Sequence, residues 1–266
     1  MKELPPVDPE AFANKLRASE TTKRLYSGKI RQYKIWLEDC RNNRKPCQNT
    51  AQEYIDYLET QGKKPNTIAT SANALRKYFR TMHKIDISLH APKIKIGEPK
   101  YRTMDEIYEL LRSTIYPLEK CLTTVLFDSG CRISEVLNLK VDDIDWEKGF
   151  IRIVGKGGYI EDVNVSEKAL DTIRLWLESR TENSKRVFMD YNYDHARKIL
   201  IDVAVRAGIK NFSPHQLRHS RAVQMREQGA DLHDVQMHLR HKNIGTTANI
   251  YGRLRPQDLK SKIPNW

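Results

Sequence analysis

The sequence predicts a mainly helical protein with a small antiparallel β-sheet, and three observations lead to that fold class. Apolar residues from Tyr26 to Leu37 recur in steps of three and four, which is the spacing of one helix face. Residues 150–154 and 159–165 are strand-like runs on either side of a glycine-rich turn, as in a β-hairpin. Residues 88–102 have no helical period and contain two prolines, a glycine and four positive charges, which indicates a linker.

The length and composition indicate a globular protein of the cytoplasm. The chain of 266 residues is long enough for one large domain or two modest ones. Hydrophobic residues make up 39%, which is enough for a core, yet no apolar run approaches membrane-spanning length. The N-terminus lacks the apolar segment of a secretory signal. The cysteines form no CxxC pair and have no metal-ligand spacing to histidines, so we expect reduced thiols and no metal site; they are Cys40, Cys47, Cys121 and Cys131.

Positive charge is concentrated in the first part of the chain. Residues 1–100 hold 20 Lys and Arg against 11 Asp and Glu, so they account for +9 of the net charge of +12. An acidic polymer such as a nucleic acid is the natural partner of such a segment. Charge alone fits a merely solvated basic surface equally well.

Three amphipathic helices are expected in this first part, after a proline-rich start at 1–16 that we expect to be only partly ordered. The first helix begins near Ser19, the second covers 50–60, and the third runs from about 67 to 83. Their charged faces fit either solvent or the phosphates of a DNA duplex. The residues of the first helix that would contact DNA are Lys23, Arg24, Lys29, Arg31 and Lys34.

These features divide the chain into a helical N-terminal domain at 1–90, a linker at 91–102 and a second domain at 103–266. In the second domain, Thr103 and Asp105 are candidate caps of a first helix. The further scaffold that we expect there comprises a buried helix at 122–128, helices at 169–180 and 195–207, and a short strand at 187–188.

A mostly buried helix at 130–139 is expected to hold an arginine at its start. Arg132 follows a glycine at position 130, and Glu135 stands three residues later among apolar neighbours. Rigid structure would therefore hold the Arg132 guanidinium while it faces outward. A structural Arg–Glu ion pair explains the same pattern, and the short motif is weak when taken alone.

The turn of the predicted hairpin contains a lysine between glycines. Lys156 lies in the segment G-K-G-G, which joins the two strand-like runs. An exposed turn residue is the commoner fate of such a lysine. The alternative is a functional group that the turn moves into and out of a site.

The segment from Ser213 to Tyr251 contains the residue types of a phosphoryl-transfer site. His215 and Arg218 are three residues apart and so share one face of a helix, which Gly229 is expected to end. Asp231 is the expected cap of the next helix. The segment then continues to His241 and, on a short helix opened by two threonines, to Tyr251. A basic, imidazole-rich surface beside a phenol suits an anionic phosphoryl centre attacked by tyrosine.

The order H-x-L-R-H, L-x-H and Y in this segment closely resembles the C-terminal signature of the tyrosine recombinases, also called the phage integrase family. The segment G-C-R-I-S-E at 130–135 and the turn I-V-G-K-G-G-Y at 153–159 match the family as well. One position departs from the pattern. The family usually has glycine before the histidine that matches His241, and this chain has Arg240 there.

The resemblance implies a helical core-binding domain followed by a mixed α/β catalytic domain, which together close around DNA. It implies a reaction in which a tyrosine forms a 3′-phosphotyrosyl bond and frees a 5′-hydroxyl, without a cofactor. Glu135 would support the first catalytic arginine, His215 would be the base, and Lys156 would protonate the leaving oxygen. The catalytic residues carried over from the family are Arg132, Lys156, His215, Arg218, His241 and Tyr251.

The resemblance also implies self-association, with a dimer on one DNA site and a tetramer in the synapse. From the length of the sequence we expect no additional N-terminal arm-binding domain, and so an Xer-type or mobile-element enzyme rather than a large phage integrase. Two rival functions remain open at this point. One is relaxation of DNA by a type IB topoisomerase, and the other is DNA binding by a protein that has lost catalysis.

Overall fold

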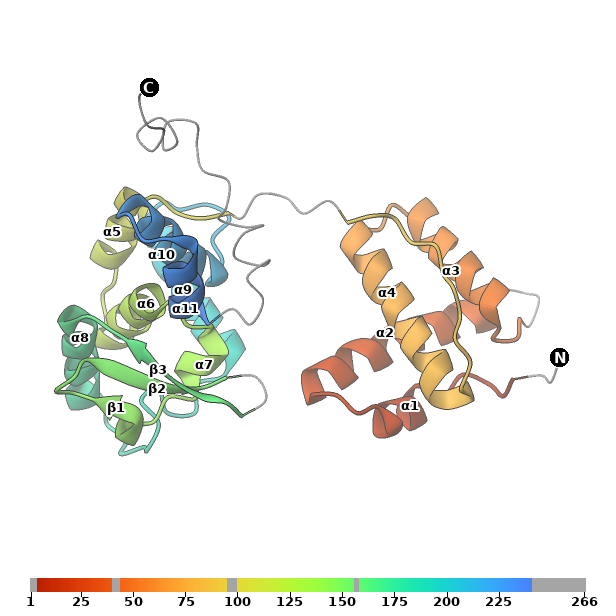
Figure 1. Ribbon diagram of the computed structural model, residues 1–266, viewed down its shortest axis with the longest axis horizontal. Coiled ribbons are helices and arrows are strands. Elements are labelled where there is room, and N and C mark those ends of the chain that lie inside the picture. The colour runs from red at the N-terminus through yellow and green to blue at the C-terminus, as the bar shows by residue number, and fades with distance from the viewer. Residues whose placement is uncertain (1–3, 40–43, 95–99, 156–157, 241–266) are drawn as a thin grey trace, which may run out of the picture. The chain divides into compact units, whose positions relative to one another are not determined.

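The chain folds into two compact units, Met1–Gly97 and Glu98–Trp266, which are described separately here (Figure 1). The computed structural model describes residues 4–39, 44–94, 100–155 and 158–240. Both units are helical, and the second also contains a three-stranded antiparallel sheet, which confirms the predicted fold class.

The first unit is a helical bundle around its own core. Its central residues, such as Ile30, Ile55 and Leu75, are at most 1% exposed, because the apolar positions of each helix turn towards one another. The elements are α1 (Pro9–Lys15), α2 (Glu20–Asp39), α3 (Gln48–Thr60) and α4 (Pro65–Tyr78), the last continued by a π-helical turn (Phe79–His83).

Helix α1 was not expected from the sequence, which suggested only partial order at 1–16. Asp8 caps it by accepting hydrogen bonds from the backbone of Glu10 and Ala11, and proline occupies its first position. Phe12 is fully buried and meets the ring of Tyr78 edge-on, with the centroids 5.4 Å apart. Burial of Phe12, together with its neighbours Val7 and Leu16, therefore holds a helix too short to be stable by itself.

The second unit is built around α6 (Pro117–Ser129), whose residues from Cys121 to Ser129 are all buried. Helices α8, α9 and α10 pack against α6, while the sheet lies at one edge of the unit (Figure 1). Its other elements are α5 (Met104–Arg112), α7 (Ile133–Leu137), a 3₁₀ turn (Val141–Asp143), β1 (Ile144–Asp145), β2 (Phe150–Val154), β3 (Ile160–Asn164), α8 (Glu167–Ser179), α9 (Tyr193–Arg206), α10 (His215–Glu227) and α11 (Leu232–Leu239).

The predicted hairpin is present as β2 and β3, with β1 added on the other side of β2. In the antiparallel register, Ile151 lies opposite Ile144 on β1 and Val163 on β3. All three are buried, so one face of the sheet contributes to the core. The other face of β2 is turned outward at Arg152 and Val154.

The prediction of a strand at 187–188 is wrong. These two residues form a turn, and the neighbouring Arg186 makes an isolated bridge with Lys140. Val187 and Phe188 are nevertheless fully buried, which explains their strand-like composition. The indole Nε1 of Trp176 donates to the carbonyl of Val187 over 2.8 Å, so this buried carbonyl has a hydrogen-bond partner.

The ends of the predicted linker belong to the two units. Leu89 is buried in the first core, and the backbone of His90 donates to Gln52. At the other end, the backbone of Arg102 donates to Ser220 on α10, and its guanidinium to the side chain of Gln216. Within the described part of the chain, no helix is long and apolar enough to cross a membrane.

Candidate active site

The turn between α6 and α7 places Arg132 at the start of a helix. Gly130 ends α6 with φ at 59°, a left-handed conformation that favours glycine. Arg132 is then the N-cap residue of α7. Its backbone N–H donates to Oε2 of Glu135 over 2.8 Å and its Nη1 to Oε1 over 2.7 Å.

This pair has an exposed cation and a buried anion. The Arg132 side chain is 46% exposed, whereas that of Glu135 is 7% exposed. Burial by itself would raise the pKa of Glu135, but hydrogen bonding from the Arg132 backbone and the positive charges of Arg240 and Arg132 outweigh it and lower that pKa. Glu135 therefore stays ionised and holds Arg132 with part of its guanidinium free to face outward.

The side chain of Arg218 connects the C-terminal end of α6 to the C-terminal end of α11. It lies on α10 and is 2% exposed, and its guanidinium donates to the carbonyls of Gly130 and Leu239. Burial, followed by repulsion from Arg132 and Arg240, lowers the pKa of Arg218 to about 10. The group therefore remains charged at neutral pH and makes the surroundings of the site strongly positive.

His215 stands at the first position of α10, one turn from Arg218. Its ring meets that of His219 edge-on, with centroids 4.5 Å apart. Loss of hydration lowers the pKa of His215, and the charges of Arg218 and Arg132 lower it further. The imidazole is therefore neutral at pH 7 and able to accept a proton.

Arg240, the departure from the family pattern, occupies the end of α11. Its backbone is left-handed, with φ at 55° and ψ at 46°, which is the conformation that glycine favours at a helix end. Its Nη2 donates to Oε2 of Glu135 over 2.6 Å, and its Nε lies 3.4 Å from Oε2 of Glu161 on β3. The arginine thus joins the end of α11 to both α7 and the hairpin.

Three of the carried-over catalytic residues lie near one another, namely Arg132, His215 and Arg218. Arg132 pairs with Glu135, His215 and Arg218 are one turn apart on α10, and the charge of Arg132 lowers the pKa of both. At the end of the β2–β3 hairpin, the backbone N–H of Gly155 donates to the carbonyl of Tyr159 over 2.8 Å. The remaining three carried-over residues, Lys156, His241 and Tyr251, lie outside the described residues.

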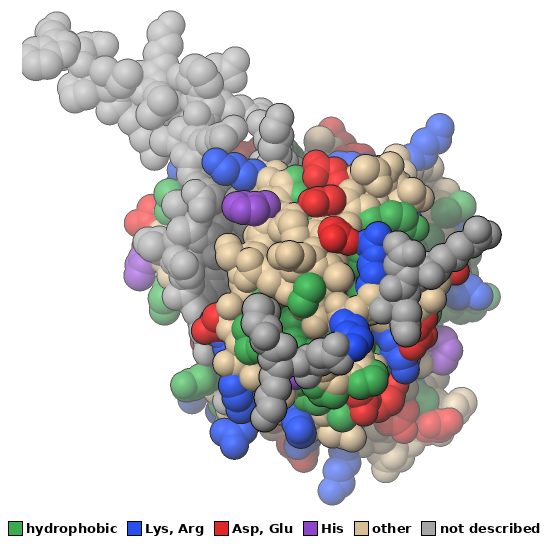
Figure 2. Space-filling model, turned by 90° about the vertical axis from the view of Figure 1, so that its right-hand side faces the viewer, with side chains coloured by type: hydrophobic (Ala, Val, Ile, Leu, Met, Phe, Trp, Pro, Cys, Tyr) green, Lys and Arg blue, Asp and Glu red, His purple; other side chains and the backbone are tan. Residues whose placement is uncertain are grey.

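The basic residues expected to contact DNA all lie on α2. Three of them are paired with carboxylates, because Lys23 contacts Glu20, Lys34 lies near Glu38 and Arg31 pairs with a glutamate of α1. Figure 2 shows one face, on which Lys and Arg side chains in general are interspersed with acidic and uncharged ones. The charge of this helix is therefore partly balanced within the protein.

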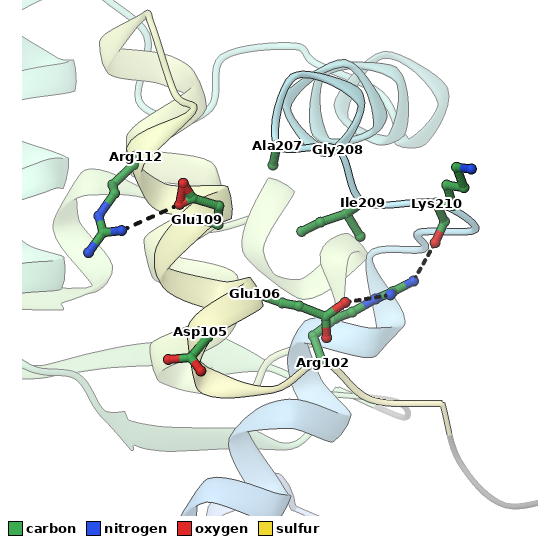
Figure 3. A pocket seen from close by; sticks show the side chains of 9 residues that line it. All are labelled: Arg102, Asp105, Glu106, Glu109, Arg112, Ala207, Gly208, Ile209 and Lys210. Carbon is green, nitrogen blue, oxygen red and sulfur yellow. Dashed lines mark hydrogen bonds and ion pairs between the residues drawn. The ribbon is translucent and has the colours of Figure 1, made fainter.

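The second unit has a surface hollow between α5 and the segment that follows α9 (Figure 3). Arg102 crosses its edge, where it contacts Glu106 and donates to the carbonyl of Lys210 over 2.7 Å. Both acidic and basic side chains line it, and none of the described candidate catalytic residues is among them. Arg102 pairs with Glu106 and Arg112 with Glu109, so much of the charge at the hollow is balanced within the protein.

Sequence reasoning did not find the part played by residues 240 and 161. The sequence shows only that Arg240 departs from the family pattern, whereas the structure shows that it contacts the same carboxylate as Arg132. Its unusual replacement of glycine was the available signal. No sequence signal identified Glu161, because an acidic residue on an exposed strand face is commonplace.

Comparison with known proteins decides the family. The family model named Phage integrase family matches residues 101–258. Tyrosine recombinase XerA of Pyrococcus furiosus is 31% identical over 96% of this chain and 92% of its own length. The chain belongs to the phage integrase family. It is a tyrosine-type site-specific recombinase, since tyrosine recombinase XerD of Listeria monocytogenes is also 31% identical, over 78% of both chains.

Solved structures agree with the fold of this recombinase. XerH site-specific recombinase, bound to its difH substrate, superposes with a TM-score of 0.76 at 20% identity, covering 97% of this chain and 84% of that chain. The Tn1549 transposon integrase, in complex with a circular intermediate DNA, gives a TM-score of 0.72 at 16% identity, covering 95% of this chain and 96% of that one. At these identities the likeness supports the fold alone.

Proposed function

We propose that this recombinase cleaves and rejoins strands of double-stranded DNA through a 3′-phosphotyrosyl intermediate formed on Tyr251. The observation that supports this most directly is that Arg132, held by the ionised Glu135, lies near Arg218 and the neutral His215. Such a cluster offers two permanent positive charges and a proton acceptor in one place, which is what attack on a phosphodiester requires.

In the proposed cleavage step, the phenol oxygen of Tyr251 attacks the phosphorus as His215 takes up the phenol proton. The bond from phosphorus to the 5′ oxygen breaks, and Lys156 supplies the proton that this oxygen needs to leave as a hydroxyl. Arg132 and Arg218 bind the non-bridging oxygens and offset the charge that grows on them. His241 donates a further hydrogen bond.

The phosphotyrosyl bond conserves the energy of the phosphodiester. Attack by the 5′-hydroxyl of a partner strand therefore reverses the step and rejoins strands without a nucleotide cofactor. We expect no metal requirement, because guanidinium, ammonium and imidazole groups supply the charge stabilisation and proton transfer.

The domain roles that we propose are DNA binding by residues 1–90 and catalysis by residues 103–266, joined by the linker at 91–102. The basic residues of α2 would contact phosphates and contribute salt-dependent affinity. Strand exchange between two duplexes calls for a dimer on each site and a tetramer in the synapse. The free cysteines, of which Cys121 and Cys131 are buried, are compatible with action in the cytoplasm.

The first test is recovery of covalent adducts from sheared DNA of the source organism, with EDTA present. Wild-type protein and Tyr251→Phe are incubated side by side, adducts are precipitated with detergent and potassium, and the trapped DNA is sequenced. We expect adducts at one recurrent sequence with the wild type and none with the variant, since phenylalanine lacks the attacking oxygen.

The other outcomes contradict the proposal in distinct ways. Adducts scattered over unrelated sequences would favour topoisomerase-like relaxation. Adducts that persist with Tyr251→Phe would move the nucleophile elsewhere. DNA binding without adducts would favour a protein that has lost catalysis.

A further inference from the structure

The backbone at residue 240 has a conformation that a non-glycine residue adopts at a cost. In the left-handed region, a Cβ atom makes the backbone less stable than glycine would be. Arg240 has this conformation, with φ at 55°. Strain of this kind persists where surrounding contacts hold the residue in place.

The Arg240 side chain is fixed by carboxylates from two other elements. It is 5% exposed and bonds to Glu135 of α7, while Glu161 of β3 lies 3.4 Å from its Nε. Its Nη1 is also buried, without a hydrogen-bond partner among the described residues. A buried guanidinium held by a buried carboxylate is anchored far more firmly than an exposed ion pair.

Glu135 connects this anchored arginine to the exposed one. Oε1 accepts from Nη1 of Arg132, and Oε2 accepts both from the Arg132 backbone and from Nη2 of Arg240. Arg132 and Arg240 therefore together fix the orientation of the Glu135 carboxylate. Without Arg240, Glu135 would keep only partners belonging to Arg132, whose side chain is 46% exposed and correspondingly freer to move.

We infer that Arg240 is a positioning residue, which fixes the Glu135 carboxylate and thereby orients the Arg132 guanidinium towards the phosphate. The inference rests on the role proposed for Arg132. It makes Arg240 a part of the site that this chain adds where the family pattern has glycine. Because orientation matters only in the reacting complex, the effect belongs to the rate of cleavage and not to DNA affinity.

The test measures single-turnover adduct formation on a nicked duplex that carries the sequence recovered from wild-type adducts. Arg240→Gly removes the side chain and relaxes the backbone, so the protein should fold with a Tm within a few degrees of wild type. We expect adduct formation at saturating DNA to slow by roughly 10- to 100-fold, with unchanged Kd. Arg240→Lys should recover part of the rate, because the ammonium keeps the positive charge beside Glu135. Recovery should be incomplete, because one ammonium cannot reproduce the separate contacts of Nη2 with Glu135 and of Nε with Glu161.

A double-mutant cycle with Glu135→Gln tests whether Arg240 acts through the shared carboxylate. If it does, Arg240→Gly should slow the Glu135→Gln enzyme far less than it slows the wild type. An equal slowing in both backgrounds would mean that Arg240 acts independently of Glu135 and would overturn the inference. Arg174→Ala is the matched control, because Arg174 pairs with Glu167 and Asp171 on α8.

A methylphosphonate at the cleaved position provides a readout that a purely structural role would not change. The methyl group removes the negative charge that Arg132 would offset, so the Arg240→Gly defect should shrink on this substrate. An undiminished defect, or cleavage of the normal duplex by Arg240→Gly at the wild-type rate, would overturn the inference alone. Failure of the wild type to form any adduct would overturn the proposed function together with it.

Discussion

At the scale of single residues, the site is governed by an excess of buried positive charge. Arg218 and Arg240 are buried and Arg132 adjoins them, while Glu135 supplies the buried negative charge. Burial of like charges is unfavourable, and its effect is visible in the lowered pKa of Arg218. A phosphate entering the site would relieve that repulsion, so the arrangement is suited to binding an anion.

The lowered pKa of His215 leads to a prediction for the pH dependence of cleavage. If neutral His215 accepts the phenol proton, the rate falls when the ring becomes protonated. A pKa below the ordinary value of about 6.5 keeps the ring neutral at lower pH, so the acid limb should lie below pH 6.5. The measurement is the single-turnover cleavage rate between pH 5 and 8.

The matched variants for this experiment are His215→Gln and His233→Gln. The first should slow cleavage by about 10²- to 10⁴-fold and remove the limb, since glutamine does not titrate. The second changes a surface histidine of α11 and should leave the limb in place. An acid limb at or above pH 6.5 in the wild type would contradict the assignment of His215 as base.

At the scale of elements, the site depends on the close approach of α11 to the turn between α6 and α7. Arg218 donates to carbonyls on both sides of this contact, at Gly130 and Leu239. A Cβ atom at Gly130 would lie 2.8 Å from Cδ2 of Leu239. Glycine is therefore favoured both for its positive φ and for the space that it leaves.

Gly130→Ala should destabilise the second unit more than a control substitution at Gly208. Gly208 has φ at 69° but no atom within 4 Å of its ideal Cβ position, so Gly208→Ala measures the backbone strain alone. We expect about 1–2 kcal/mol for the control and at least about 1 kcal/mol more for Gly130→Ala. Urea unfolding of both variants checks this, and equal losses would show that Leu239 yields freely.

At the scale of the whole molecule, the two units have separate hydrophobic cores. Aromatic and aliphatic residues of α1 to α4 form one core, and α5 to α9, with the sheet and the start of α10, form the other. Each unit has the layered packing of an independent domain. The positive balance is concentrated in the first, which should therefore dominate the non-specific attraction to DNA.

A fragment comprising residues 98–266 should consequently fold without the first unit and bind DNA with a weaker dependence on salt. Each lost phosphate contact reduces the slope of log K against log salt by about 0.9. The measurements are thermal unfolding by circular dichroism and binding isotherms at several salt concentrations, with the full chain as reference. Equal slopes for fragment and full chain would contradict the DNA-binding role proposed for residues 1–90.

The family, the helical class and the hairpin could all be predicted from the amino-acid sequence. Helices with regular apolar spacing, such as α2, and caps such as Thr103 and Asp231 were predictable because they depend on neighbours in the chain. The catalytic residues were assigned from sequence motifs of the family. Three of them, Arg132, His215 and Arg218, lie near one another in the structure.

Features that depend on contacts between residues distant in the sequence became apparent only in the folded chain. Helix α1 is held by buried contacts such as that between Phe12 and Tyr78, and 187–188 forms a buried turn rather than a strand. Likewise, Arg240 meets Glu135 across 105 positions of the chain. Local pattern carries no information on such pairs, because their energy comes from burial and charge that exist only once the chain has folded.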